Sequence, residues 1–198
     1  MARRGGGGRR QRQRRQQVQY EELDKYPVMP PHAFARIVRD LRTLNIIYQV
    51  IEPPLTKKEE EVRSEIMDIF IQALTADIDE IDANPELYLR AAMDQIVKSY
   101  RLKVNKKSRS KIFYYLKRDL IGYGRMDVLM NDANVEDVSL DGTNIPIFAY
   151  HRKFESVETT ISWPDDPELE SYVIKLAQRC LLYTSDAADD MQCVDLGG

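Results

Sequence analysis

Between residues 57 and 122 the apolar side chains recur every three or four positions, the pattern of helices with one buried face. Thr56 and Glu59 form a capping box at the start of the first helix. An N-cap amide and a proline in the first turn, Asn84 and Pro85, start the second. The expected helices run from Lys57 to about Ile81, from Pro85 through Tyr100, and from Ser108 or Ser110 to Gly122, where a left-handed glycine would end the third.

Shorter runs on both sides of this region favour strands. Residues 33–38 and 46–51 are rich in β-branched and aromatic side chains and predict two short strands. The stretch before them, Tyr20 to Pro31, is interrupted by prolines and is expected to be extended. Residues 20–121 therefore predict an N-terminal strand pair followed by a subdomain of three helices.

Residues 122–179 predict a second unit that contains both strands and helices. A short helical turn from Met126 to Asn131, with Met126, Leu129 and Met130 inward, leads into a strand that carries Val138 and Leu140. Asp141-Gly142 reverses the chain into a returning strand through Ile147, Phe148 and Tyr150. Strict alternation predicts a half-buried antiparallel strand with Val157, Thr159, Ile161 and Trp163 on its inner face.

A last helix is expected after Pro164. Asp166-Pro167-Glu168 is a helix start, and the buried stripe would consist of Leu169, Tyr172, Val173, Leu176 and Ala177. Alternating strands and helices that do not form a regular βαβ repeat predict an α+β fold. The chain thus predicts a helical subdomain followed by a small sheet with helices on one side.

Charge is distributed unevenly along the 198 residues. The formal charge is −3, yet seven arginines and no acids lie within the first fifteen residues, which leaves about −10 for the rest. Residues 1–19 are expected to be a disordered basic tail, because Gly, Gln and Arg cannot bury enough apolar surface to order it. No aromatic residues interleave the arginines, so a solubilising tail or a membrane-binding arm is favoured over a specific nucleic-acid reader.

From about Asn45, through the IEPPLT motif at Ile51–Thr56, to Arg179, the chain resembles the N-terminal region of archaeal secretion ATPases. These belong to the type II/type IV secretion superfamily, whose members drive assembly of pili and archaella. The resemblance implies a PAS-like domain over residues 122–179. It also implies a cytoplasmic, homo-hexameric motor that lies at the inner face of the cell membrane, docked on a polytopic platform protein.

The resemblance implies ATP and Mg²⁺ as cofactors of the complete motor. In such hexamers the N-terminal domain of one subunit packs over the nucleotide site of its neighbour, where its basic residues can reach the phosphates. The candidates here are Arg152 and, less surely, Arg125, Lys153 and His151. A solvated surface arginine is an equally good interpretation of Arg152.

The chain itself lacks the parts that phosphoryl transfer requires. GxxxxGK[ST] is absent, and so is an acidic Mg²⁺ ligand after an apolar strand. Gly122 and Gly124 lack the preceding strand and the Lys-Ser or Lys-Thr of a phosphate loop, and His32 and His151 have no companions at metal-ligand spacing. We therefore expect no catalytic residues, no metal site and no bound cofactor in this fragment alone.

Residues 180–198 differ in character from the rest and resemble a translated sequencing adapter. Cys180 to Ser185 reads Cys-Leu-Leu-Tyr-Thr-Ser, the translation of a transposase-end sequence in its second frame. Two interpretations remain open. The chain is the oligomerising and regulatory front part of a secretion motor whose gene continues beyond codon 179, or it is a stand-alone, non-catalytic binding module with a basic arm for membrane or nucleic acid.

Overall fold

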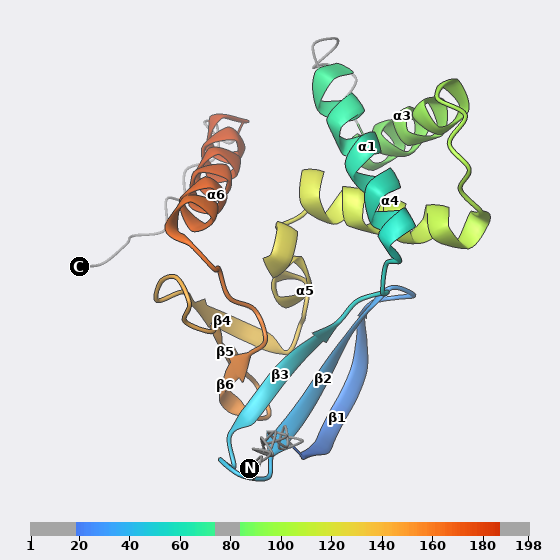
Figure 1. Ribbon diagram of the computed structural model, residues 1–198. Helices are drawn as coiled ribbons and strands as arrows, with labels where there is room; N and C mark the ends of the chain where they lie inside the picture. The colour runs from blue at the N-terminus through green and yellow to red at the C-terminus, as the bar shows by residue number, and fades with distance from the viewer. Residues whose placement is uncertain (1–18, 74–83, 187–198) are drawn as a thin grey trace, which may run out of the picture.

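The computed structural model describes residues 19–73 and 84–186, with side chains described as far as residue 178. The expected basic tail, and the part of the first helix expected beyond Ala73, lie outside these residues. The fold is α+β, as predicted: one six-stranded sheet with strand order β1-β2-β3-β6-β5-β4 carries helices on one side (Figure 1). No nucleotide-binding core is present in the described part of the chain.

The first half of the sheet is an antiparallel meander of β1 (Tyr20–Met29), β2 (Ala33–Asp40) and β3 (Ile46–Ile51). Both predicted strands are confirmed. The extended stretch before them is a full ten-residue strand, which the sequence analysis had not assigned as one. Pro27 fits there because β1 is an edge strand, where a missing N–H breaks no ladder between two strands.

The second half is an antiparallel meander of β4 (Val135–Ser139), β5 (Phe148–His151) and β6 (Glu155–Thr159). The predicted inner face is confirmed, since Val157, Thr159, Ile161 and Trp163 are all buried. Regular strand pairing ends at Thr159. The alternation nevertheless persists, because backbone hydrogen bonds from Ile147 to Ile161 and from Asn144 to Trp163 hold the continuing chain in register.

The two meanders meet at a short parallel contact between β3 and β6. Only two residue pairs form it, Ile47 with Glu158 and Tyr48 with Thr159. The sheet therefore contains strands from both sides of the boundary expected between residues 121 and 122, and the helices that follow β3 are inserted between its two halves.

The inserted helices are α1 (Lys57–Ala73), α3 (Pro85–Ser99) and α4 (Lys106–Leu120). The capping box is confirmed, since the Thr56 amide donates to Glu59 and the Glu59 amide donates to the Thr56 hydroxyl. Asn84 caps α3 as predicted, through its side-chain oxygen and the Leu87 amide. The prediction for α4 is wrong by one turn, because Asn105, rather than Ser108 or Ser110, is its N-cap.

Gly122 does not end α4 in the left-handed conformation that we expected, because its φ is not among the positive values. The reason for glycine is steric: a Cβ there would lie 2.4 Å from Asp127 Oδ1 and 2.8 Å from the Arg118 carbonyl oxygen. Gly124 instead has the positive φ, 56°, where the 3₁₀ turn η1 (Gly124–Met126) begins. The close approach of Gly122 to Asp127 and Arg118 lets α5 (Asp127–Met130) follow directly after this 3₁₀ turn.

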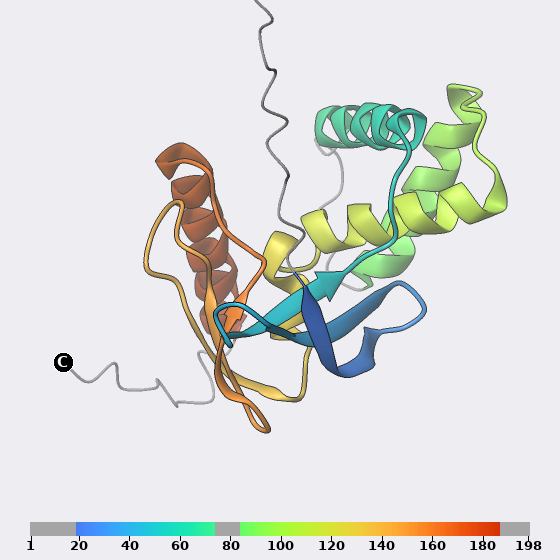
Figure 2. The same ribbon diagram turned by 60° about the horizontal axis from the view of Figure 1, so that its bottom comes forward.

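Three expected inward positions are wrong. The side chains of Met126, at the end of η1, and of Val128 and Leu129 in α5 are buried, but Met130 is 48% exposed. In α6 (Asp166–Asp186) Tyr172 packs on Trp163, whereas Val173 and Ala177 are exposed. Near its start, α6 packs against the sheet core through Leu169 and Tyr172. Further along, Lys175 donates to the Asp119 carbonyl of α4, while most of the helix lies to one side of α1 and α3 (Figures 1 and 2).

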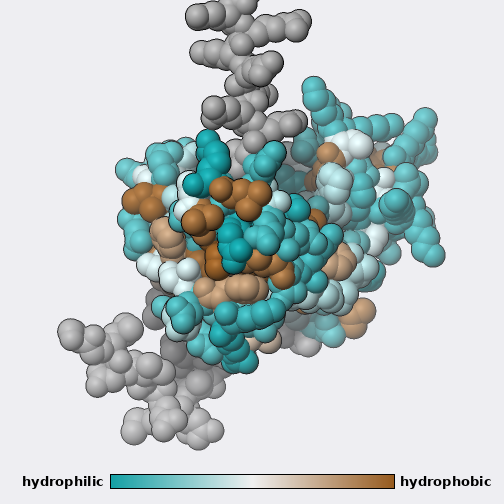
Figure 3. Space-filling view, turned by 90° about the horizontal axis from the view of Figure 1, so that it is seen from below, coloured by the Kyte–Doolittle hydropathy of each residue, from teal (hydrophilic) through white to brown (hydrophobic). Residues whose placement is uncertain are grey.

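The sheet face opposite the helices carries apolar and polar side chains together (Figure 3). Cross-strand pairs on it include Phe34 with Ile51, and Phe148 with Glu158. Separate cores lie on the other side: one under α5 and one among α1, α3 and α4. No helix among the described residues is long and apolar enough to span a bilayer.

Candidate functional site

The turn between β5 and β6 brings three of the four candidate residues together. His151 is only 2% exposed, while the side chains of its neighbours Arg152 and Lys153 are 63% and 65% exposed. The Arg152 amide donates to the Asn134 carbonyl, 2.9 Å away, which ties the turn to the segment before β4. The turn thus presents two cations to solvent from a base whose central ring is buried.

Hydrogen bonds define the tautomer of His151. Nδ1 accepts the backbone N–H of Lys153 at 3.1 Å, so this nitrogen carries no proton in the neutral ring. Nε2, which then carries the proton, lies 2.9 Å from the hydroxyl of Tyr26. Burial lowers the pKa of His151 below its ordinary value of 6.5, with opposing contributions from the nearby Asp132 and Asp24 carboxylates. The ring is therefore held neutral, as a structural hydrogen-bonding group.

Asp132 is the acceptor at the other end of this hydrogen-bond network. Its Oδ2 accepts hydrogen bonds from Tyr26 at 2.7 Å and from Tyr48 at 2.6 Å, and its Oδ1 accepts from the Asn134 amide. Tyr48 is fully buried and Asp132 is 5% exposed. Burial, together with the bond to Asp132, raises the pKa of both phenols, so they stay protonated donors. The network joins β1, β3 and β5 beneath the sheet's helical layer.

Each exposed cation of the turn rests against a carboxylate. Arg152 Nε lies 2.9 Å from Glu136 Oε1 in β4, and Lys153 Nζ lies 3.0 Å from Asp24 Oδ2 in β1. These contacts are solvated, so each contributes about 1 kcal/mol or less and can exchange for another anion. The turn can therefore offer a planar guanidinium and an ammonium to an incoming phosphate or carboxylate.

Arg125 does not join this group. It lies in η1, where it contacts the Ser162 carbonyl and the carboxylate of Glu168 at the start of α6. Next to Ser162 in the chain, the Trp163 carbonyl accepts the N–H of Asn144, which lies before the first residue of β5. Arg152, in contrast, follows the last residue of β5. The structure thus places Arg125 and Arg152 toward opposite ends of β5.

The structure gives the IEPPLT motif a physical role that sequence reasoning missed. Glu52 accepts two hydrogen bonds from the Arg118 guanidinium, at 2.8 and 2.9 Å, and a third from the Tyr114 hydroxyl at 2.7 Å. The carbonyls of Pro53 and Pro54 accept from Tyr115 and Lys111. These hydrogen bonds attach the chain that leaves β3 to α4. We call the contacts of Glu52, Pro53 and Pro54 with α4 the latch. A lone carboxylate between an apolar strand and two prolines is the sequence signal that could have indicated it.

In the described residues no group of three or more His, Cys, Asp and Glu side chains lies close enough to hold a metal ion. Arg152 and Lys153 are exposed cations that can donate hydrogen bonds to phosphate or carboxylate oxygens.

No family model matches the chain. It is similar to the uncharacterized protein MJ1288 of Methanocaldococcus jannaschii, with 40% identity over 134 residues that cover 67% of this chain and 53% of the relative. It is also similar to the uncharacterized protein MJ0900 of the same organism, 34% identical over 87 residues, or 44% of this chain and 16% of the relative. The chain thus spans about half the length of the first relative and a small part of the second.

Proposed function

We propose that this chain is the N-terminal, oligomerising and regulatory part of a hexameric secretion ATPase, which powers assembly of a pilus or archaellum, or protein export. The native reading frame would continue beyond residue 179 into the nucleotide-binding core. ATP and Mg²⁺ would bind to that core, so the fragment alone would neither hold nucleotide nor hydrolyse it. The complete protein would be cytoplasmic and would dock on a polytopic platform protein at the inner face of the membrane.

The observation that carries the proposal is the β5–β6 turn. Its two neighbouring cations are more than 60% exposed, while buried His151 and the Asn134 carbonyl hold the backbone beneath them. A cation that acts across a subunit boundary must be exposed and must be held by a rigid backbone, because electrostatic catalysis depends on preorganised charge. Arg152 supplies the planar fork suited to phosphate, and Lys153 supplies a second donor beside it.

Two further observations support the proposal. The resemblance to secretion ATPases runs through the IEPPLT residues, and these residues have a specific structural role in the latch with α4. The second relative is much longer than its matched segment, since 87 residues are only 16% of it. The length of this relative agrees with a chain that forms one part of a larger protein.

The test uses the protein encoded by the complete reading frame, amplified from source DNA. We expect nucleotide-dependent hexamers by light scattering and ATP hydrolysis that falls about tenfold or more in Arg152→Gln, since one preorganised charge contributes at least this much to phosphoryl transfer. Arg39→Gln is the matched control, because Arg39 forms a comparable surface ion pair with Glu21, 2.8 Å away on strands β2 and β1. A monomer that ignores ATP and Mg²⁺ would instead favour the stand-alone binding module.

A further inference from the structure

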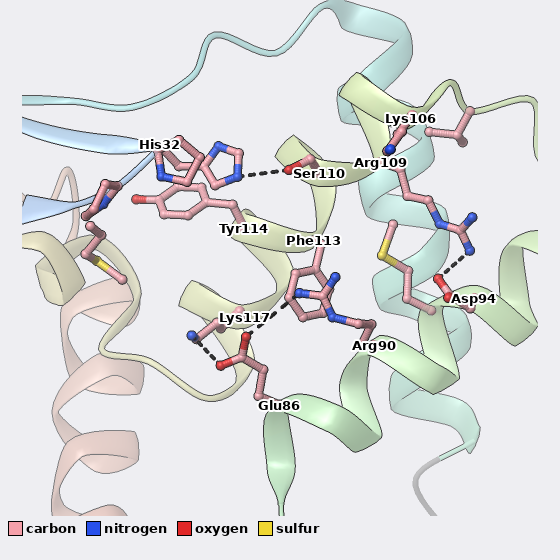
Figure 4. Close-up of a pocket in the computed structure, with 15 residues that line it drawn as sticks. His32, Glu86, Arg90, Asp94, Lys106, Arg109, Ser110, Phe113, Tyr114 and Lys117 are labelled. Carbon is pink, nitrogen blue, oxygen red and sulfur yellow. Dashed lines mark hydrogen bonds and ion pairs between the residues drawn. The ribbon is translucent and has the colours of Figure 1, made fainter.

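A large pocket lies between the β1–β2 turn and the helices α3 and α4 (Figure 4). Its volume is about 850 Å³, within the range of pockets that bind ligands in other proteins. His32 in the turn closes one side, where its Nε2 lies 3.0 Å from the Ser110 hydroxyl and its ring lies against Tyr114. None of the residues of the β5–β6 turn line this pocket.

The middle of the pocket is apolar and aromatic. Phe113 is 8% exposed and Met93 only 1%. The guanidinium of Arg90 lies 4.1 Å from the centre of the Phe113 ring, so a cation covers the aromatic surface without sealing the pocket. A ligand that entered here would contact a hydrophobic centre through an aliphatic or aromatic group.

The charges around this centre are in cationic excess. Four cations line the pocket, Arg90, Lys106, Arg109 and Lys117, against the two carboxylates of Glu86 and Asp94. Glu86 is shared between Lys117, at 2.6 Å, and Arg90, at 3.9 Å. Burial lowers the pKa of His32, so this ring adds no charge near neutral pH. The lining therefore carries two uncompensated positive charges.

These cations do not converge on one point. Arg109 pairs with Asp94 at one end of the pocket, Lys117 pairs with Glu86 at the other, and Phe113 lies between them (Figure 4). A single phosphate group needs donors gathered around one centre, whereas here two positive positions flank an apolar one. The pairs are solvated, with side chains 37–53% exposed, and can exchange partners at little cost.

We propose that this pocket binds an acidic peptide segment of a partner protein, with two carboxylates on either side of an apolar side chain. The carboxylates bind the Lys106–Arg109 end and the Arg90–Lys117 end, and the apolar side chain contacts Phe113 and Met93. This peptide site lies apart from Arg152 and needs no nucleotide. It therefore stands or falls independently of the ATPase proposal.

The experiment selects displayed random seven-residue peptides on the full 198-residue chain and measures the enriched peptides by fluorescence anisotropy. Lys106→Glu is the test variant, because it reverses one charge on an exposed residue of the pocket. Lys107→Glu is the matched control, since it makes the same change one residue further along α4, outside the pocket lining. Equal urea midpoints of the two variants establish that both are folded.

We expect enrichment of peptides with two acids flanking an apolar residue. Lys106→Glu should weaken their binding about fivefold or more, because it replaces one attraction with a repulsion near solvent. Lys107→Glu should weaken their binding less than about twofold. The proposal is overturned if no enriched peptide distinguishes the two variants. It is also overturned if ATP or inorganic phosphate binds with this sensitivity while acidic peptides do not.

Discussion

The hydroxyl of Tyr26 in β1 lies 2.9 Å from Nε2 of His151 in β5, although three strands separate β1 from β5 in the sheet order. The same hydroxyl donates to Asp132, and Asp24, two residues before Tyr26, reaches Lys153. The backbone joins the two meanders by only two parallel residue pairs. Side-chain hydrogen bonds of this network therefore reinforce a weak seam in the sheet.

Removing the Tyr26 hydroxyl tests that role. Tyr26→Phe leaves the Nε2–H of His151 without its acceptor and Asp132 with one donor fewer, so we expect the free energy of unfolding to fall by about 1–3 kcal/mol. Urea denaturation followed by circular dichroism measures it. Tyr150→Phe is the control, because that side chain is 47% exposed. Equal stability of the two variants would show that the network does not hold the seam.

His151 predicts a pH dependence of stability. Its pKa in the folded protein is below 6.5, so between these two values the unfolded chain binds the proton more readily. Stability should therefore be complete above about pH 6.5 and decline as the pH falls from there toward the folded pKa. His151→Gln should be less stable at pH 8 yet show a flatter decline in urea titrations from pH 7 to 5.

His32 is the control for that slope, because burial lowers its pKa too and the chain has only two histidines. His32→Gln measures its separate share of the decline. If His151→Gln retained the full pH dependence of the unmodified protein, the buried neutral ring could not be its source.

The latch formed by Glu52 predicts a larger effect than surface ion pairs do. Glu52→Gln would remove the carboxylate that accepts from Arg118 Nη1 and leave Arg118, whose side chain is 14% exposed, with Asp119 as its charged partner. We expect a loss of about 2–3 kcal/mol. Glu136→Gln makes the same change in the exposed pair with Arg152 and should lose about 1 kcal/mol or less. Urea midpoints of the two variants compare them directly. Equal losses in Glu52→Gln and Glu136→Gln would mean that the latch contributes no more stability than an exposed ion pair.

Gly122 predicts a steric defect. Gly122→Ala would place a methyl group against Asp127 Oδ1 and the Arg118 carbonyl, and the resulting overpacking should lower the free energy of unfolding by about 1–3 kcal/mol. Gly124→Asn is the control, because nothing lies near its Cβ position and Asn tolerates a positive φ. Thermal unfolding separates the two variants. A neutral Gly122→Ala would remove the steric explanation.

Local signals were readable from the sequence where one or two neighbouring residues decide the outcome. The capping box at Thr56, the Asn84 cap and the alternation from Val157 to Trp163 are of this kind. The α4 start was misplaced because two serines follow the true cap, Asn105, and are equally plausible caps by residue type. Residue type alone does not distinguish Asn105 from the two serines, and the folded structure shows that Asn105 is the cap.

Long-range features were not readable in the same way. Nothing local indicates that Tyr26 meets His151, 125 positions later, or that β3 pairs with β6. Val173 is 46% exposed although its apolar spacing predicts an inward position, because spacing alone does not show how much of α6 the rest of the protein covers. Arg152 and Lys153 were found as candidates by resemblance, and the carboxylates that hold them come from strands distant in the sequence.

The central proposal is that these residues are the front part of a secretion motor, and sequencing the gene from source DNA downstream of codon 179 tests it most directly. We predict a reading frame that continues through a linker into a GxxxxGK[ST] loop and an acidic Mg²⁺ ligand. A genuine stop codon after the residues Cys180 to Gly198 would contradict the proposal and leave a non-catalytic binding module.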